Sequence, residues 1–237
     1  MTLYLIGIGL NDEKDITLKG LEIVKKCSKV FLESYTSILQ IDISKLEELY
    51  GKKVILADRE LVEKNSDEIL SGEDVAFLVI GDALSATTHV DLMERAKEKN
   101  INVEVIHNAA VLTAVGVTGL QLYKFGKTTS IPFHDAVTPC RIIKENQSIG
   151  AHTLCLLDLD PINNKFLTIK EGIDKLIEGG FKEDTLCVGC ARLGSKDFVV
   201  KTGTAKELKE FEFGSAPYCL IVPGDLHFVE EEIIKNY

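Results

Sequence analysis

The polar residues best placed for chemistry follow an apolar run at residues 75–80, which Gly81 and Asp82 end. A continuous apolar run of this length is typical of a strand that is buried on both faces. In an open α/β sheet, the loop that leaves the carboxyl end of a strand is where a ligand binds. Asp82 is therefore either a turn residue before the next helix or a carboxylate that binds a ligand, such as the hydroxyls of a ribose.

The residues after Asp82 are small or carry hydroxyl groups, and they precede a helical segment at residues 91–96. Serine and threonine are preferred N-caps because the side-chain oxygen accepts a hydrogen bond from the first turn of the helix. Three residues could each cap this helix: Ser85, Thr87 and Thr88.

Two other apolar segments end in comparable loops. The segment at residues 3–8 runs into a turn at Gly9, and the segment at residues 103–106 runs into His107 and Asn108. If the strands are parallel, all three loops lie along one edge of the sheet and form a crevice. We therefore expect a ligand at that edge.

Gly7 and Gly9 match only part of the Gly-x-Gly-x-x-Gly fingerprint of dinucleotide-binding folds. The third glycine would fall at Asp12. The helix also begins several residues too late for its amino terminus to meet a pyrophosphate. A tight turn that exposes backbone to some ligand is favoured over a nicotinamide site.

Two further clusters favour structural roles. Cys187 and Cys190 have the C-x-x-C spacing, but odd spacing within a strand points the thiols to opposite faces, so core packing is favoured over a metal or redox site. Asp158 and Asp160 could form a paired-acid site. The following Pro161 favours a solvent-exposed turn instead.

The sequence lacks several motifs that mark common enzyme classes. It has no Gly-x-x-x-x-Gly-Lys-Ser/Thr loop, no Gly-x-Ser-x-Gly elbow and no His-Glu-x-x-His, so NTPase, hydrolase and zinc-protease functions lose their usual support. His89 and His107 have no cysteine or carboxylate beside them at metal-ligand spacing. We therefore predict no metal site.

The order of apolar segments divides the chain into two domains. In residues 1–112, strand-like runs alternate with helical stripes, which favours a parallel sheet. In residues 113–237, the runs at 185–191 and 197–201 have no helix between them, which favours antiparallel pairing. We predict a two-domain α/β fold with a mainly parallel first sheet, a mixed second sheet and a glycine-rich hinge at residues 114–126.

The composition is typical of a soluble globular protein. The 237 residues are 45% hydrophobic and 27% charged, and no apolar run approaches the roughly 20 residues that a membrane helix needs. The first residues lack the basic leader of a signal peptide, so we expect a cytoplasmic protein without membrane contact. The net charge of −10 argues against nucleic-acid binding and suits a cationic ligand or a basic protein partner.

Segments that span most of the chain match one known family in order. They are residues 3–10, 15–21, 33–37, 57–60, 81–89, 107–109, 119–126, 152–158 and 187–189. Together they resemble the diphthine synthase family, in its compact archaeal form, within the tetrapyrrole methylase superfamily.

This resemblance implies a homodimer in which each chain holds S-adenosylmethionine in a cleft between two α/β domains. It implies methyl transfer to the amino nitrogen of 2-(3-amino-3-carboxypropyl)histidine on translation elongation factor 2. The products are S-adenosylhomocysteine and the trimethylated residue diphthine, an intermediate of diphthamide biosynthesis. No general base is assigned by the resemblance.

Carried over motif by motif, the resemblance implies cofactor contacts from both domains. The first domain contributes Leu10, Asp82, Ser85, Ala110 and Val111, and the second contributes Leu157, Leu193 and Tyr218. The chain departs from the family at two positions, since Ala83 stands where the family often has Pro and Tyr218 stands where it often has His.

Three alternatives remain open at this point. A methyltransferase of the same fold could act on a tetrapyrrole precursor. The chain could also be a non-catalytic regulatory module that has kept the cofactor pocket. A nicotinamide oxidoreductase is the third alternative.

Overall fold

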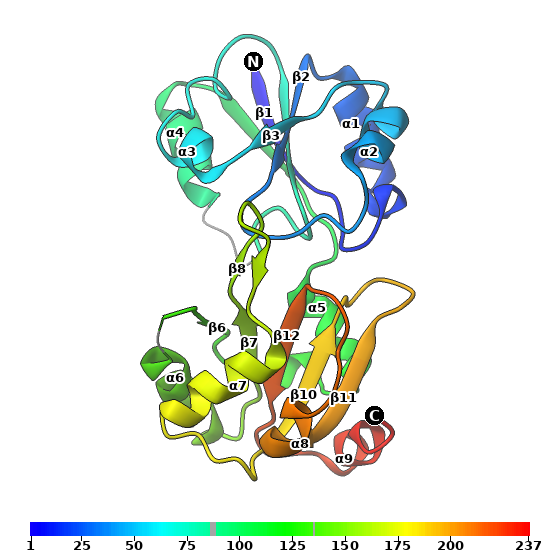
Figure 1. Cartoon of the computed structure of the whole chain (residues 1–237). Coiled ribbons are helices and arrows are strands. Elements are labelled where there is room, and N and C mark those ends of the chain that lie inside the picture. The colour runs from blue at the N-terminus through cyan, green and yellow to red at the C-terminus, as the bar shows by residue number, and fades with distance from the viewer. Residues whose placement is uncertain (86–88, 135) are drawn as a thin grey trace. The chain divides into compact units, whose positions relative to one another are not determined.

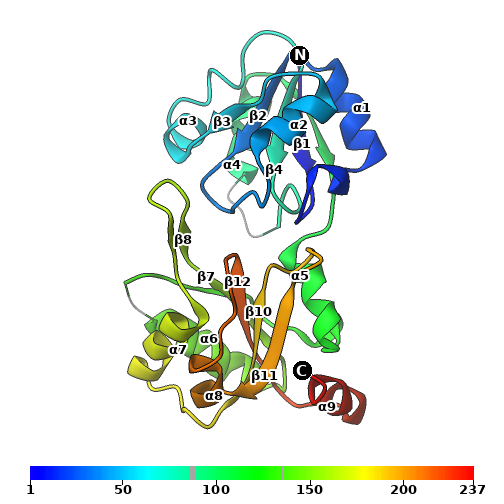
Figure 2. The same ribbon diagram turned by 45° about the vertical axis from the view of Figure 1, so that its right-hand side comes forward.

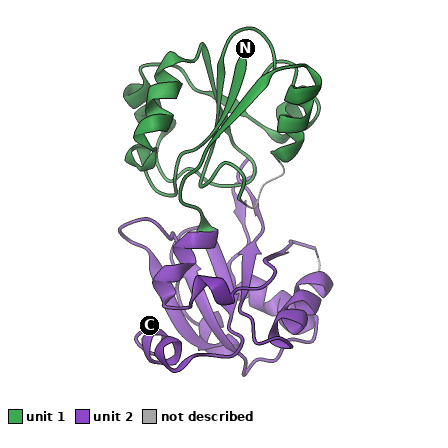
Figure 3. Ribbon diagram, turned by 180° about the vertical axis from the view of Figure 1, so that it is seen from behind, with its two compact units in different colours: residues 1–111 green, residues 112–237 purple. Residues whose placement is uncertain are grey.

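The computed structural model describes residues 1–85, 89–134 and 136–237. The chain divides into two compact units, Met1–Val111 and Leu112–Tyr237 (Figure 3). Thr87 and Thr88, two of the three candidate helix caps, lie outside the described residues. None of the described helices is both long and apolar enough to cross a membrane.

The first unit is built on a five-stranded sheet with the strand order β3-β2-β4-β1-β5. All neighbouring strands pair in parallel, which confirms the predicted parallel sheet. The elements of this unit are β1 (Thr2–Gly7), η1 (Glu13–Asp15), α1 (Leu18–Lys26), β2 (Lys29–Glu33), α2 (Ile43–Tyr50), β3 (Ile55–Ala57), α3 (Arg59–Glu63), β4 (Val75–Val79), α4 (Val90–Glu98) and β5 (Asn102–Ile106).

Helices cover both faces of the first sheet. In Figure 1, α1 and α2 lie on one side of the sheet and α3 and α4 on the other. Alternate residues of β1 enter the two cores, with Leu5 packed in one cluster and Ile6 in the other. All five residues of β4 are buried, which explains why this strand reads as a continuous apolar run.

Of the three candidate caps of α4, the one that lies among the described residues, Ser85, is wrong. Ser85 does not cap this helix, because its hydroxyl donates a hydrogen bond to Oδ1 of Asp82 at 3.2 Å. The residue at the N-cap position is His89, which makes no side-chain capping bond. The hydroxyl is thus used to close the loop after β4 and not to begin the helix.

The second unit is built on a sheet with the strand order β11-β10-β12-β7-β6. Its β6–β7 pair is parallel and its other pairs are antiparallel, which confirms the predicted mixed sheet. The elements that follow the first unit are α5 (Val111–Ala114), η2 (Val115–Thr118), η3 (Leu122–Lys124), β6 (Thr129–Ile131), α6 (Val137–Gln147), β7 (Thr153–Leu157), β8 (Leu159–Asp160), β9 (Lys165–Phe166), α7 (Ile169–Glu178), β10 (Leu186–Ala191), β11 (Val199–Thr204), α8 (Ala205–Lys209), β12 (Tyr218–Val222) and α9 (Phe228–Ile234).

Two features of the second unit differ from the sequence-based expectation. Residues 114–126, expected as an irregular hinge, contain the short helical segments η2 and η3. Residues 159–166 form a small hairpin, β8–β9, that the sequence did not predict. Both features are too short to produce a clear hydrophobic period, which is the signal that identifies longer elements.

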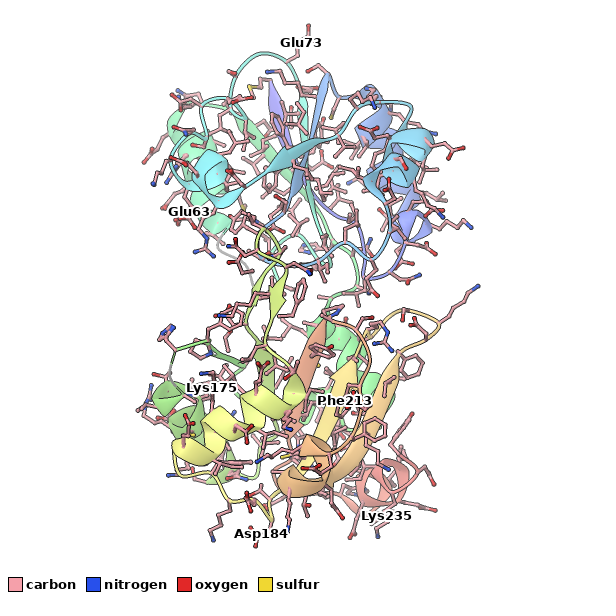
Figure 4. The ribbon with its side chains drawn as sticks, in the orientation of Figure 1. Glu63, Glu73, Lys175, Asp184, Phe213 and Lys235 are labelled. Atoms are coloured by element: carbon pink, nitrogen blue, oxygen red, sulfur yellow. The ribbon has the colours of Figure 1, made fainter. Side chains whose placement is uncertain are left out.

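The main core of the second unit lies between the sheet and helices α6, α7 and α8. Figure 2 shows these helices together on one face of the sheet, with α9 on the other side. Phe213, labelled in Figure 4, is buried in this core. Cys187 belongs to the same core, and Cys190 is also fully buried. Both thiols are free, as expected for core residues.

A buried carboxylate fastens the carboxyl-terminal helix α9 to the second sheet. Oε1 of Glu230 accepts hydrogen bonds from the backbone of Gln121 at 2.8 Å and from Nε2 of His152 at 3.0 Å. Oε2 accepts from the backbone of His227 at 2.8 Å and pairs with Lys124. Burial raises the pKa of Glu230, but these hydrogen bonds outweigh burial and lower it to about 2.

We predict that Glu230→Ala destabilises the protein by about 3–5 kcal/mol, because it leaves three N–H donors without an acceptor and Lys124 without its ion-pair partner. Urea unfolding measures this loss. Glu231→Ala is the matched control, since Glu231 is exposed and its one ion pair within the described part of the chain is with Lys235 on the same helix. Its free energy of unfolding should change by less than about 0.5 kcal/mol. Equal losses in the two variants would contradict the assigned role of Glu230.

Candidate functional site

The loops that follow β1 and β4 are joined directly to each other. Gly9 and Gly81 form an isolated antiparallel bridge, with N–O distances of 3.1 and 2.7 Å. A Cβ atom on Gly7 would lie 2.6 Å from the carbonyl oxygen of Gly81 and 2.9 Å from Cβ of Asn108. Glycine is therefore required at position 7 because three loops meet there, and not to approach a pyrophosphate.

Asp82 ties the β4 loop to the β5 loop. Its Oδ1 accepts hydrogen bonds from the backbone of Leu84 at 3.0 Å and from the hydroxyl of Ser85 at 3.2 Å. Its Oδ2 accepts from Nδ1 of His107 at 2.9 Å and from the backbone of Asn108 at 3.0 Å. A carboxylate has about four acceptor positions, so the loops themselves use the full capacity of Asp82.

The electrostatic state of Asp82 follows from these bonds. Asp82 is only 7% exposed, and burial alone would raise its pKa. The hydrogen bonds from Asn108, Leu84 and His107 outweigh burial and lower the pKa below its usual value of 3.8. Asp82 is therefore a fixed anion that holds loops in place at neutral pH.

Asn108 and Asp15 complete this arrangement, and sequence reasoning missed the role of both. Nδ2 of Asn108 donates to the carbonyl oxygens of Gly7 and Asp15, each at 2.9 Å. Oδ2 of Asp15 accepts from the backbone of Leu10 at 3.1 Å and of Asn11 at 2.8 Å. The β1 loop is thereby held against the β5 loop.

The loops after β1, β4 and β5 surround a small space at Gly81. This residue has φ +86°, and a Cβ atom on it would lie 3.8 Å from Cδ2 of Leu10 and 3.9 Å from Cα of Ala110. Leu10 and Ala110, two of the predicted cofactor contacts, thus flank an opening that the missing side chain leaves. The predicted contacts Ser85 and Val111 are half-buried in the same set of loops.

The predicted contacts of the second unit lie along one edge of its sheet. Tyr218, at the start of β12, is paired with Ala191 at the end of β10. The next residue of β12 pairs with Leu156, so Leu157 at the end of β7 also lies at this edge. Leu193 follows β10 by two residues. The structure thus brings Leu157, Leu193 and Tyr218 to the same end of three neighbouring strands.

Arg192 holds the two loops at this edge, a role that the sequence did not reveal. Its Nε donates to Oδ2 of Asp197 at 2.8 Å. Its Nη1 donates to the carbonyl oxygens of Phe213 at 3.0 Å and Ser215 at 2.6 Å. Its backbone N–H donates to the carbonyl of Pro217 at 2.9 Å. These bonds set the positions of the neighbouring residues, which are predicted cofactor contacts.

The remaining candidate residues have structural partners. His89 is buried, and burial lowers its pKa to about 4, so it is neutral at physiological pH. Oδ1 of Asp160 accepts from the backbone of Asn163, which confirms the predicted turn. Among the described residues, no group of three or more His, Cys, Asp or Glu could hold a metal ion.

The chemistry available at these edges is that of binding and orientation. The first unit offers backbone groups of three linked loops with the apolar side chains of Leu10 and Ala110. The second offers the buried side chains of Leu157 and Leu193. Asp82 is ionised and fully hydrogen-bonded, so it is poorly suited to accept a proton during catalysis.

Comparison with known proteins identifies close relatives over nearly the whole chain. Residues 2–209 match the profile of the Tetrapyrrole (Corrin/Porphyrin) Methylases. The chain is 46% identical to the diphthine methyl ester synthase of Schizosaccharomyces pombe, over 99% of this chain and 93% of the relative. It is 42% identical to the diphthine synthase of Methanococcus aeolicus, over 98% of this chain and 96% of the relative.

The solved structures agree with these matches. A crystal structure of diphthine synthase has a TM-score of 0.95 to this chain at 39% sequence identity, and the match covers 100% of this chain and 96% of that chain. The alignment to the S. pombe relative spans 264 positions, more than the 237 residues present here. That relative therefore carries residues that this chain lacks.

We predict that Asp82→Asn lowers the free energy of unfolding by about 2–3 kcal/mol, because an amide cannot accept all four of the bonds to Asp82. Since the pKa of Asp82 is lowered, the stabilisation is fully present above its usual value of 3.8 and is lost as pH falls below that value. Urea unfolding at a series of pH values measures both effects.

Asp67→Asn is the control for this prediction, because Asp67 is exposed and, among residues 1–85, 89–134 and 136–237, forms an ion pair with Lys99 alone. Its effect should stay within about 0.5 kcal/mol. The hydrogen-bonding role of Asp82 would be wrong if the two variants unfolded alike at neutral pH.

Proposed function

Because the chain belongs to the tetrapyrrole methylase family, we propose that it is the S-adenosylmethionine-dependent methyltransferase that makes diphthine. It trimethylates the amino group of 2-(3-amino-3-carboxypropyl)histidine on translation elongation factor 2, a step of diphthamide biosynthesis. The observation that carries this proposal is an identity of 42–46% to relatives named for diphthine, over almost the full length of the chain.

The cofactor contacts in this proposal are those that the family resemblance implies, taken for each unit by itself. In the first unit, Leu10 and Ala110 flank the opening at Gly81, and Ser85 and Val111 extend the same surface. The second unit contributes the edge formed by its three predicted contacts: Leu157, Leu193 and Tyr218. Apolar side chains beside exposed backbone suit an adenosine, which has a flat ring and several hydrogen-bonding edges.

The mechanism requires positioning more than acid–base chemistry. When bound, the cofactor supplies a methyl group on a sulfonium, which is already activated for transfer. The loop residues of the chain hold the reacting groups in line, and orientation of this kind contributes about 7–11 kcal/mol. In the first unit, the apolar side chains of Leu10 and Ala110 exclude water from the bound group. Asp82 acts through the loops that it holds, so we class it as a positioning residue.

A second candidate differs only in the extent of methylation. The S. pombe relative is named a diphthine methyl ester synthase, whereas the Methanococcus relative is named a diphthine synthase. An ester synthase would also methylate the carboxylate of the same side chain. The compact length favours the archaeal type of product, in which only the amine is methylated.

The remaining parts of the proposal concern partners and surroundings. Elongation factor 2 is the protein substrate, and we propose that the chain acts as a cytoplasmic homodimer. The net charge of −10 agrees with a cationic cofactor and a basic partner surface. A tetrapyrrole precursor as acceptor, or a regulatory module without transfer, are the alternatives that the following experiment separates.

We predict that the protein adds methyl groups to elongation factor 2 that carries the modified histidine, and not to the factor with an unmodified histidine. Mass spectrometry of the factor after incubation with protein and S-adenosylmethionine measures this. Three added methyl groups support the amine-only product, and four support the ester. Cofactor binding without transfer to either form of the factor would overturn the proposed function.

We predict that Gly81→Ala weakens S-adenosylmethionine binding by about 10- to 100-fold, because the new methyl group occupies the opening beside Leu10 and Ala110. Gly72→Ala is the matched control, since Gly72 has φ +91° and nothing within 4 Å of a Cβ atom. Both variants should lose about 1–2 kcal/mol of stability from the positive φ. Calorimetric titration should show weaker binding for Gly81→Ala alone, and equal affinities would show that the opening is not part of the site.

A further inference from the structure

The carboxyl ends of all five strands form one edge of the first sheet. The loops after two of these strands, β2 and β3, contain no predicted cofactor contact. The strand order is β3-β2-β4-β1-β5, and the predicted contacts of this unit follow β1, β4 and β5. The ends of β2 and β3 are adjacent to β4 at the same edge, because all five strands are parallel. An acceptor that reacts beside the cofactor has to approach from a neighbouring part of this edge.

The ends of β2 and β3 are fastened together and carry a group of polar side chains. The backbone N–H and hydroxyl of Ser34 both donate to the carbonyl of Ala57, at 3.0 and 3.1 Å. The next residue, Tyr35, is buried, and the guanidinium of Arg59 lies 5.2 Å from the centre of its ring. The buried Tyr35 ring is thus a rigid surface beside the Arg59 guanidinium, and we call it the support of Arg59.

Glu33 holds Tyr35 in position through the backbone. It is fully buried, and its Oε1 accepts hydrogen bonds from the backbone of Tyr35, at 2.8 Å, and of Thr36. Its Oε2 is buried and has no hydrogen-bond partner among the described residues. A buried oxygen without a partner is costly and rare in a folded protein. This cost indicates that Glu33 is kept beside Tyr35 for a role other than packing.

Arg59 itself carries a positive charge that is largely exposed to solvent. Its side chain is 67% exposed, and its ion pair with Glu63, labelled in Figure 4, is long at 3.8 Å. It is also the first residue of α3, where the helix dipole disfavours a positive charge. Helix stability therefore does not explain an arginine here. The charge of Arg59 opposes the effect of burial on the pKa of Glu33, and its exposed planar guanidinium also suits two-point recognition of a second carboxylate.

We propose that Arg59 binds the carboxylate of the aminocarboxypropyl side chain of the acceptor, with Tyr35 as its support and Glu33 as the residue that positions Tyr35. This inference rests on the proposed function, since the acceptor there carries a carboxylate close to the amine that is methylated. Binding at the carboxylate end leaves the amine free to face the neighbouring cofactor loops. It also distinguishes the modified histidine from an unmodified one, which has no such carboxylate.

The test compares Arg59→Gln with Arg141→Gln. Arg141 is the matched control, because it is 61% exposed and also pairs with a glutamate four residues along its helix. For Arg59→Gln we expect the KM for elongation factor 2 bearing the modified histidine to rise about 10- to 100-fold, as for the loss of a charged hydrogen bond. The Kd for S-adenosylmethionine should stay unchanged. Arg59→Lys should recover part of the KM, and Arg141→Gln should match the unmutated protein.

Competition with unmodified elongation factor 2 separates a contact to the side chain from a contact to the surface of the factor. If Arg59 binds the carboxylate, inhibition by the unmodified factor is the same for the unmutated protein and for Arg59→Gln. An unchanged KM in Arg59→Gln, or a weaker inhibition by the unmodified factor that matches the rise in KM, would overturn the inference. No methylation by the unmutated protein would instead refute the proposed function.

Discussion

The site in the first unit depends on the hydrogen bonds of one carboxylate. Asp82 follows a fully buried strand and accepts four bonds from the loops after β4 and β5. Loops at the end of a sheet would otherwise lose conformational entropy without compensation, since few apolar contacts hold them. Because Asp82 is buried and ionised, each of its bonds is stronger than a bond to a neutral group. The position of Ala110 beside the opening at Gly81 follows from this constraint, whereas Asp15 holds the backbone of Leu10.

In the second unit, a positively charged side chain, that of Arg192, holds the loops at the strand ends. Arg192 donates to carbonyl oxygens of the loop before β12 and to Asp197 in its own loop. Leu193 and Tyr218 lie beside these bonds. Neither unit holds a recognisable set of acid, base and nucleophile at its described edge. This is the arrangement expected of an enzyme whose cofactor carries the activated group, because the protein then has to bind, align and exclude water.

Much of the fold could be predicted from the sequence, because strands buried on both faces leave a strong local signal. The parallel sheet, the mixed sheet and the meeting of three loops at one edge all followed from such segments. The residues that hold the loops could not be found in this way. Asn108 bonds to Gly7, 101 residues away in the chain, and Arg192 reaches residues 21 and 23 positions later. Such contacts have no periodicity and no fixed spacing.

The same reason explains the error at Ser85, whose capping signal is local, whereas its actual partner depends on the bends around Gly81 and Asp82. It also explains why no local sequence pattern indicates a role for Arg59 or Glu33, which lie in segments that match the family. The proximity of Arg59 to Tyr35 arises from the pairing of β2 with β3, whereas Glu33 lies two residues from Tyr35 in the chain. For the site residues, the sequence supplied candidates through resemblance, and the structure supplied the hydrogen bonds that order them.

The central claim is that the loops after β1, β4 and β5 of the first unit bind the cofactor, and hydrogen exchange with and without S-adenosylhomocysteine tests it most directly. We expect slower exchange at residues 9–11, 81–85 and 108–111 of the first unit, and also at residues 156–158, 192–195 and 215–218 of the second. Unchanged exchange at residues 9–11, 81–85 and 108–111 would contradict the claim.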